Sequence, residues 1–122
     1  IKIFSKESFD RWLAGDRAME CVRAALTAAK QAGTALEVSS AGLRKPCREI
    51  YPGPVIMRLA AELELGITFA SDAHCTATPA YAFNELARYA ASFGFSFSRW
   101  FEQGKVRLMP FTAPEAIPSR PA

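Results

Sequence analysis

The sequence contains very little histidine and cysteine and no long apolar run. One histidine and three cysteines, Cys21, Cys47 and Cys75, occur among 122 residues. An odd number of cysteines without paired spacing argues against a disulfide framework and suits a reducing compartment. Charges interrupt every apolar stretch before the roughly 20 residues that a membrane-spanning helix needs, and the first residues do not read as a signal peptide. We therefore expect a soluble, cytoplasmic protein with no membrane partner.

Neither positive nor negative charge is in large excess. The 15 basic and 12 acidic residues leave a net charge of +3, too mild for the concentrated basic face typical of nucleic-acid-binding proteins. We expect no nucleic-acid partner. The sequence shows no Gly-rich phosphate loop and no Ser-His-Asp arrangement, so neither of these sites is predicted. Half of the residues are apolar, which is ordinary for one small globular domain.

Strand and helix patterns alternate along the chain. Helices are predicted where apolar residues recur at helical spacing between start and stop signals, at 5–13, 16–33, 54–66 and 79–93. Short strands are predicted at 1–4, 35–38, 67–70 and 105–109. The segment 39–54 is predicted as a loop, and the aromatic residues between 93 and 101 are expected to pack. This order indicates an α/β fold with parallel strands, in which functional loops gather at the strands' C-terminal ends.

Asp72 and His74 follow the predicted strand 67–70 and are two residues apart, so their side chains can project to one side. A carboxylate and an imidazole together suit Zn, Mn or Fe. Alternatively, Asp72 caps the loop and His74 is an ordinary polar residue near the surface. A catalytic metal normally needs three or more protein ligands, so any such site has to obtain others elsewhere.

Arg44 and Lys45 lie on the loop after strand 35–38. The planar fork of Arg can donate two parallel hydrogen bonds to a phosphate, and Lys adds a point charge; the alternative is an ordinary solvated loop. Two interpretations of Glu37 are open. It orients Arg44 or a metal ligand without binding the substrate or the metal itself, or it faces water. Tyr51 is a possible wall of the pocket. Cys75, next to His74, is not expected to be a ligand or a nucleophile.

The chain contains Ala-Leu-Glu-Val at 35–38, Gly-Leu-Arg-Lys-Pro at 42–46, Glu-Ile-Tyr-Pro at 49–52 and Ser-Asp-Ala-His at 71–74. In their order and spacing, these four motifs resemble the PHP-domain histidinol phosphatases. Ser-Asp-Ala-His alone resembles PHP domains in general, including those attached to bacterial DNA polymerases. The histidinol phosphatase branch is indicated by Gly-Leu-Arg-Lys-Pro and Glu-Ile-Tyr-Pro. The resemblance runs from about residue 1 to residue 109.

The resemblance implies a distorted (βα)7 TIM-like barrel, of which residues 1–109 would be the C-terminal portion and 110–122 a Pro-rich tail. It implies a cluster of divalent metal ions (Zn, Mn or Fe) whose activated water hydrolyses L-histidinol phosphate to L-histidinol and phosphate, in histidine biosynthesis. By position, Asp72 and His74 would be metal ligands. Arg44 would hold the substrate phosphate, with Lys45 a second candidate.

The chain departs from the family in its metal ligands. The His-x-His near the family's N-terminus and the other His and Glu ligands of its first half have no counterpart in a chain with one histidine, and Ser39 stands where relatives usually have Asn. The chain begins with Ile1, so we expect a fragment or a missing N-terminal half, inactive alone. An incomplete barrel exposes strand edges and favours self-association. The alternatives are a non-catalytic half-barrel that binds or assembles, and a PHP phosphoesterase acting on nucleotides or DNA ends.

Overall fold

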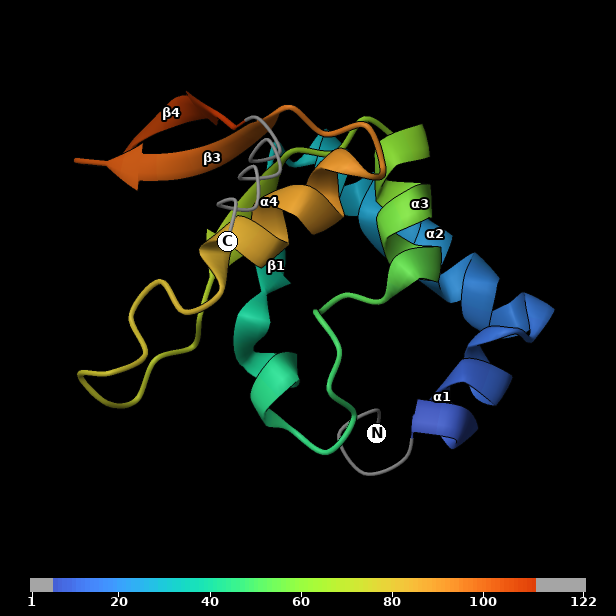
Figure 1. The fold of residues 1–122 in the computed structure, drawn as a ribbon. Coiled ribbons are helices and arrows are strands. Elements are labelled where there is room, and N and C mark those ends of the chain that lie inside the picture. The colour runs from blue at the N-terminus through green and yellow to red at the C-terminus, as the bar shows by residue number, and fades with distance from the viewer. Residues whose placement is uncertain (1–5, 112–122) are drawn as a thin grey trace, which may run out of the picture.

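The computed structural model describes residues 6–111, in which helices and strands alternate over much of the chain (Figure 1). Its elements follow in the order α1 (Lys6–Leu13), α2 (Asp16–Gln31), β1 (Leu36–Ser39), the 3-10 helix η1 (Ser40–Arg44), α3 (Pro54–Glu62), β2 (Ile67–Ala70), α4 (Phe83–Ala91), β3 (Phe97–Glu102) and β4 (Lys105–Pro110). The mixed α/β class is confirmed, whereas the barrel stays a prediction. The predicted strand at 1–4 and the tail from residue 112 lie outside the described residues.

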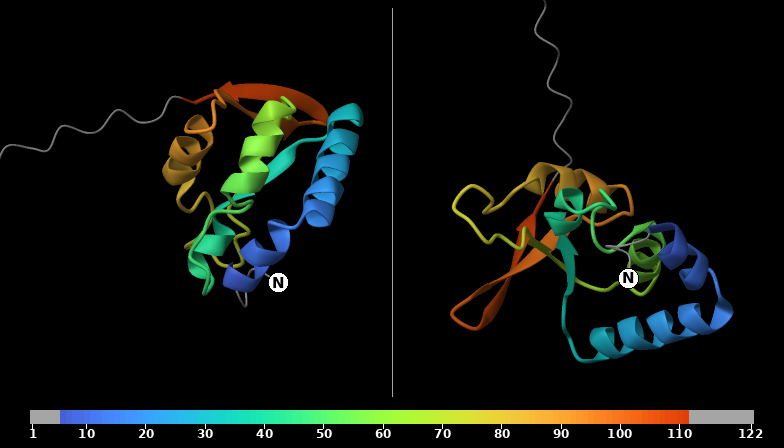
Figure 2. Two further views of the ribbon diagram at one scale, coloured as in Figure 1. Left: turned by 90° about the vertical axis from the view of Figure 1, so that its right-hand side faces the viewer. Right: turned by 90° about the horizontal axis from the view of Figure 1, so that it is seen from below.

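Strands β1 and β2 form a parallel pair, as the alternation of strands and helices predicts. Leu36 pairs with Ile67 and Ser39 with Ala70, and α3 provides the crossover between the strands. Helices α2, α3 and α4 lie in a row beside this pair (Figure 2). Because the strands are parallel neighbours, their C-terminal ends meet at one edge, and the segments that follow them begin side by side.

The core lies between the strand pair and the helices. Val38 and Ile67 from the strands pack with Met57 of α3 and Leu86 of α4, and all four are fully buried. A second cluster, where α2 meets α3, contains Leu26, Leu59, Ala60 and Leu65. Burying the Val, Ile, Leu and Met side chains of these clusters stabilises the chain by roughly 1.5–3 kcal/mol each. This packing holds β1 and β2 in place.

The last two strands form an antiparallel hairpin, so the prediction of a parallel final strand is wrong. Phe97 of β3 pairs with Pro110 of β4, and Glu102 with Lys105. The turn between them has positive φ at Gln103 and Gly104, 49° and 74°, the pattern that a two-residue hairpin turn needs. The aromatic residues predicted to pack are therefore partly on a strand, and several of them are exposed.

Helix α4 is shorter than predicted, because it begins at Phe83 rather than at residue 79. Ala80 and Ala82 adopt left-handed backbone with φ of 55° and 57°, and such residues interrupt a right-handed helix. Residues 71–82 are therefore a loop. Phe111, after β4, packs against the core with its ring centroid 5.1 Å from that of Phe69.

Across residues 6–111, every helix is too short or too polar to cross a membrane.

Candidate functional site

A surface hollow of about 400 Å³ lies at the C-terminal edge of β1 and β2. It is lined by residues from η1 and Lys45 on one side and from the 71–82 loop on the other: Arg44, Lys45, Asp72, His74, Cys75 and Thr78. Figure 1 shows η1 and this loop leaving the strand pair on the same side. Four of the six residues singled out from the sequence therefore meet, and their roles stay predictions.

The sequence between 39 and 51 folds back on itself and holds η1 in place. The Ser39 side chain accepts a hydrogen bond from the Ala41 amide at 3.2 Å, which caps the helix. The backbones of Ser39 and Tyr51 exchange hydrogen bonds of 2.7 and 3.0 Å. Gly42 fits beneath this return, since a Cβ there would lie 2.0 Å from the carbonyl oxygen of Glu49. Any residue with a Cβ at position 42 would therefore clash with the backbone.

Arg44 connects η1 to the turn after β2. Its Nη2 donates to the carbonyl oxygens of Ser71 and Asp72, the second at 3.2 Å. Its guanidinium carbon lies 5.4 Å from the centre of the Tyr81 ring. The side chain is thus held from two directions, by hydrogen bonds at its edge and by an aromatic face.

His74 hydrogen-bonds to the backbone of its own turn. Its Nδ1 lies 2.7 Å from the carbonyl oxygen of Asp72. A carbonyl oxygen can only accept, so the neutral imidazole carries its proton on Nδ1 and keeps the lone pair of Nε2 free. The carboxylate of Asp72 lies 3.9 Å from the same Nδ1, and the two side chains are 81% and 56% exposed for His74 and Asp72. Both can reach a ligand in the hollow.

Asp72 and His74 fit a divalent metal in kind but not in number. Carboxylate oxygen and imidazole nitrogen suit Zn, Mn and Fe. However, no group of three or more His, Cys, Asp or Glu side chains in the described part of the chain is arranged to hold a metal ion. A catalytic metal normally has three protein ligands or more, so no chemical step is assigned to a metal on these two residues alone.

Glu37 and Tyr51 lie away from the hollow. Glu37 is exposed on β1 and pairs in register with Thr68, which agrees with the water-facing alternative for this residue. Tyr51 stands behind η1, with its hydroxyl 3.3 Å from Cys47 Sγ and its ring against Gly42. Burial, followed by the hydrogen bond with Cys47, raises the pKa of Tyr51 to about 12. In this structure Tyr51 supports the loop that carries Arg44.

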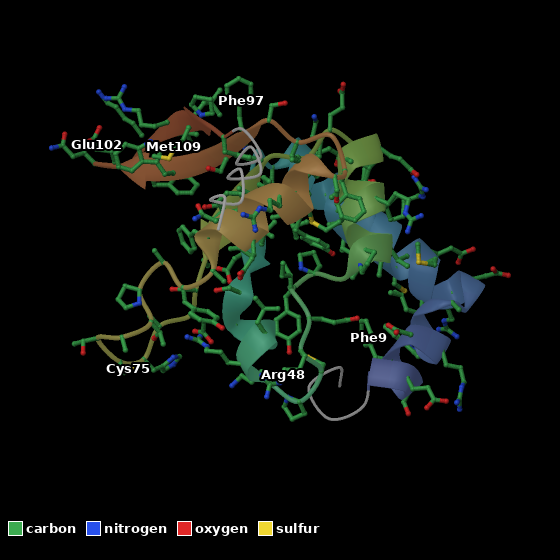
Figure 3. All side chains as sticks on the ribbon, in the orientation of Figure 1. Phe9, Arg48, Cys75, Phe97, Glu102 and Met109 are labelled. Atoms are coloured by element: carbon green, nitrogen blue, oxygen red, sulfur yellow. The ribbon has the colours of Figure 1, made fainter. Side chains whose placement is uncertain are left out.

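The 71–82 loop contributes two residues that the sequence did not single out, Thr78 and Tyr81. Thr78 Oγ1 lies 3.5 Å from Cys75 Sγ, and this contact lowers the pKa of the Cys75 thiol more than the nearby Arg44 charge does. Figure 3 shows Cys75 at the outer side of the loop. No short sequence motif identifies Thr78 or Tyr81, because their positions depend on two backbone turns. In the first turn the Thr78 amide donates to the Cys75 carbonyl, and in the second the Tyr81 amide donates to the Thr78 carbonyl.

We expect alkaline unfolding to begin as the pH rises above 10. Tyr89 donates to the Pro52 carbonyl at 2.9 Å, and burial raises its pKa from 10.0 to about 12, as for Tyr51. Between these values the unfolded chain loses protons that the folded chain keeps, so stability falls as pH increases. Urea midpoints measured from pH 9 to 12 test this. Tyr89→Phe should make the decline shallower; an unchanged midpoint up to pH 12 would contradict the expectation.

A 42-residue segment of the chain is 48% identical to a curated protein of Deinococcus radiodurans named "Probable histidinol-phosphatase". The match covers 34% of this chain and 16% of that relative. No protein-family model matches the chain. The chain therefore spans only a small part of the relative's length, and the similarity supports a possible relation to this phosphatase.

Proposed function

We propose that this chain provides part of the active site of a metal-dependent phosphomonoesterase of the histidinol phosphatase type. The observation that carries the proposal is the shared hollow, where Arg44 and Lys45 of one loop lie beside Asp72 and His74 of the next. A basic pair and a carboxylate–imidazole pair at one mouth are what a phosphate ester and a cation require together. The partial similarity to a protein named as a probable histidinol phosphatase supports the same substrate class.

Arg44 would bind the phosphoryl group through the N–H groups that it does not use for hydrogen bonds to the Ser71 and Asp72 carbonyls. A guanidinium has five N–H donors, and the hydrogen bonds that Arg44 makes within residues 6–111 use Nη2. Lys45, exposed beside it, adds a second positive charge. Asp72 and Nε2 of His74 would hold a divalent ion, which when bound activates water and neutralises phosphoryl oxygens. The residues of this chain would therefore bind and orient the phosphoryl group and the divalent ion.

We expect the isolated chain to hydrolyse L-histidinol phosphate negligibly. The two donors described here fall short of the three or more ligands that a catalytic metal normally has, so metal binding should be weak. Phosphate release with added Mn or Zn measures this. Turnover at ordinary enzymatic rates would show that these residues suffice for catalysis, and the expectation that the metal site needs further ligands would be wrong.

The binding half of the proposal can be tested without turnover. His74 is the only histidine, so its imidazole NMR signals report on this hollow alone. Inorganic phosphate should shift these signals in the unaltered chain. Loss of charge-assisted hydrogen bonds in Arg44→Gln should weaken phosphate binding about tenfold or more. Mn²⁺ should broaden the His74 signals, and less so in Asp72→Asn.

Arg48→Gln is the matched control for Arg44→Gln. Arg48 lies on the same segment but outside the residues that line the hollow, and Figure 3 shows it low in the view, in the loop between η1 and α3. It should leave the phosphate response unchanged. Equal losses in both variants would mean that phosphate senses the general charge of the loop, and signals unmoved by phosphate in the unaltered chain would end the proposal.

A second candidate function, non-catalytic assembly, is favoured by the β3–β4 hairpin. Phe97, Phe101, Val106 and Leu108 are exposed and, by the strand register, lie on one face. At these exposed fractions the four side chains provide several hundred Å² of apolar surface, roughly half of the 800 Å² that each partner buries in a stable complex. We propose that a second copy of this chain covers the face, since identical apolar faces pair around a two-fold axis.

Light scattering tests this self-association. The chain should be a dimer at micromolar concentration, and the double variant Phe101→Ser, Leu108→Ser should be a monomer. Trp12→Ser, which removes a similarly exposed side chain from α1, is the control and should leave the dimer intact. A well-folded monomer at all concentrations would contradict the proposal.

A further inference from the structure

Four groups form a chain of contacts that ends at the His74 ring. The Tyr81 ring lies against the Arg44 guanidinium. Arg44 Nη2 donates to the Asp72 carbonyl oxygen at 3.2 Å, and the same oxygen lies 2.7 Å from His74 Nδ1. One backbone oxygen therefore accepts from both the predicted phosphate-binding residue and the predicted metal ligand. The state of the His74 imidazole depends on this oxygen, because the bond to it places the proton on Nδ1.

Tyr81 is the one member of this chain of contacts without another evident task. It is 42% exposed and belongs to neither buried core cluster. An aromatic face under a guanidinium attracts the cation while leaving its N–H edge free for hydrogen bonds. The Tyr81 ring thus holds the Arg44 guanidinium from one side without competing for its donors.

The loop around Tyr81 needs contacts of this kind. Asp72, Ala80 and Ala82 have positive φ, at 50°, 55° and 57°, and each non-glycine residue held in this region costs roughly 1–2 kcal/mol. Such backbone persists only where surrounding contacts determine it. The contact between Arg44 and Tyr81 joins η1 to this loop.

We infer that Tyr81 is a positioning residue for the hollow, which holds Arg44 so that phosphate donors and the Nε2 lone pair of His74 are presented together. The inference rests on the proposed function for the use of the site. Its structural content, the transmission from Tyr81 through Arg44 and the Asp72 carbonyl to His74, can be measured in the ligand-free chain.

The first measurement is the ring ¹⁵N shifts of His74 at mildly alkaline pH, where free imidazole is neutral. In the unaltered chain and in Tyr81→Phe, the shifts should show the proton on Nδ1, because both keep the ring under Arg44. In Tyr81→Ala they should move toward the tautomer mixture of free imidazole. Arg44→Lys, which keeps the charge but cannot offer a planar fork, should show the same movement.

The second measurement is the affinity for inorganic phosphate. Loss of a partly exposed cation–π contact should weaken binding by about two- to fivefold in Tyr81→Ala, with Tyr81→Phe close to the unaltered chain. Urea midpoints provide the folding check, and they should be similar because Tyr81 lies outside both core clusters. Tyr81→Leu, which keeps an apolar side chain but has no aromatic face, serves as the second variant if Tyr81→Ala fails to fold, and it should weaken phosphate binding to the same extent.

The outcomes separate the inference from the proposed function. If Tyr81→Ala matches the unaltered chain in its ¹⁵N shifts, the inference is wrong even where phosphate binds. It is also wrong if Tyr81→Phe is impaired as much as Tyr81→Ala, since the hydroxyl rather than the ring would then act. If the unaltered chain binds no phosphate, the proposed function fails, and the tautomer comparison still decides whether Tyr81 positions His74.

Discussion

Leu86→Ala should lower the free energy of unfolding by about 2–5 kcal/mol, the range found for large-to-small changes in cores. Leu86 is fully buried and belongs to the cluster formed by Val38, Met57 and Ile67. Helix α4, which carries it, contacts both β1 and β2, so a cavity here has walls from two strands and two helices and cannot collapse easily. The strands end at the hollow, and the site should loosen with them.

Urea unfolding measures this effect, with Val55→Ala as the control. Val55 is 44% exposed on α3, and changes at such surface positions stay within about 0.5 kcal/mol. A cost below about 1 kcal/mol for Leu86→Ala, or equal costs for both variants, would show that the chain lacks the packed core described here.

The sequence was sufficient to predict the part of the fold that carries the site. A short apolar run at 67–70, bounded by Gly66 and by Ser71-Asp72, marks β2 as the structure has it. Pro54 marks the start of the crossover helix α3. With the strands parallel, the loops after them had to open at one edge, and Arg44 does bond to the Ser71 and Asp72 carbonyls.

The strand predicted at 105–109 corresponds to β4, but β3 and its antiparallel pairing with β4 could not be predicted in the same way. A half-buried strand shows alternating apolar and polar residues, but β3 has aromatic side chains on both faces, with Phe97 and Phe101 on one and Trp100 on the other. The strong hairpin signals, Asn-Gly and Asp-Gly, are replaced by Gln103-Gly104, whose positive φ values do the same work. Local sequence therefore indicated packing where the chain makes a strand.

Tyr81 escaped prediction for a different reason. Its contact with Arg44 joins two loops that are far apart in sequence, and the loop path depends on alanines in left-handed backbone, a region that the sequence gives no reason to expect at Ala80 or Ala82. Position in space, rather than residue type, makes this tyrosine part of the site.

Gly42→Ala should cost about 3 kcal/mol or more and should abolish the phosphate response of His74. The added Cβ would lie 2.0 Å from the Glu49 carbonyl oxygen and 2.8 Å from the Tyr51 ring. Overpacking typically costs about 1–3 kcal/mol, and more where nothing can give way. The obstacle here is backbone, itself held by the Ser39–Tyr51 hydrogen bonds. Relief requires η1 to move, and Arg44 then leaves the Ser71 and Asp72 carbonyls.

Gly66→Ala is the matched control, because its Cβ would also come too close to another atom, but to an atom of a different kind. That atom is Arg99 Nε at 2.3 Å, near the end of a flexible side chain that also donates to the Gly33 carbonyl at 3.0 Å. Arg99 can turn away at the loss of about one hydrogen bond, roughly 1 kcal/mol, and Gly66 precedes β2, at the end away from the hollow. Gly66→Ala should keep the phosphate response of His74. If Gly42→Ala keeps it too, the fold of the 39–51 segment does not determine where Arg44 lies, and the hollow loses its structural basis.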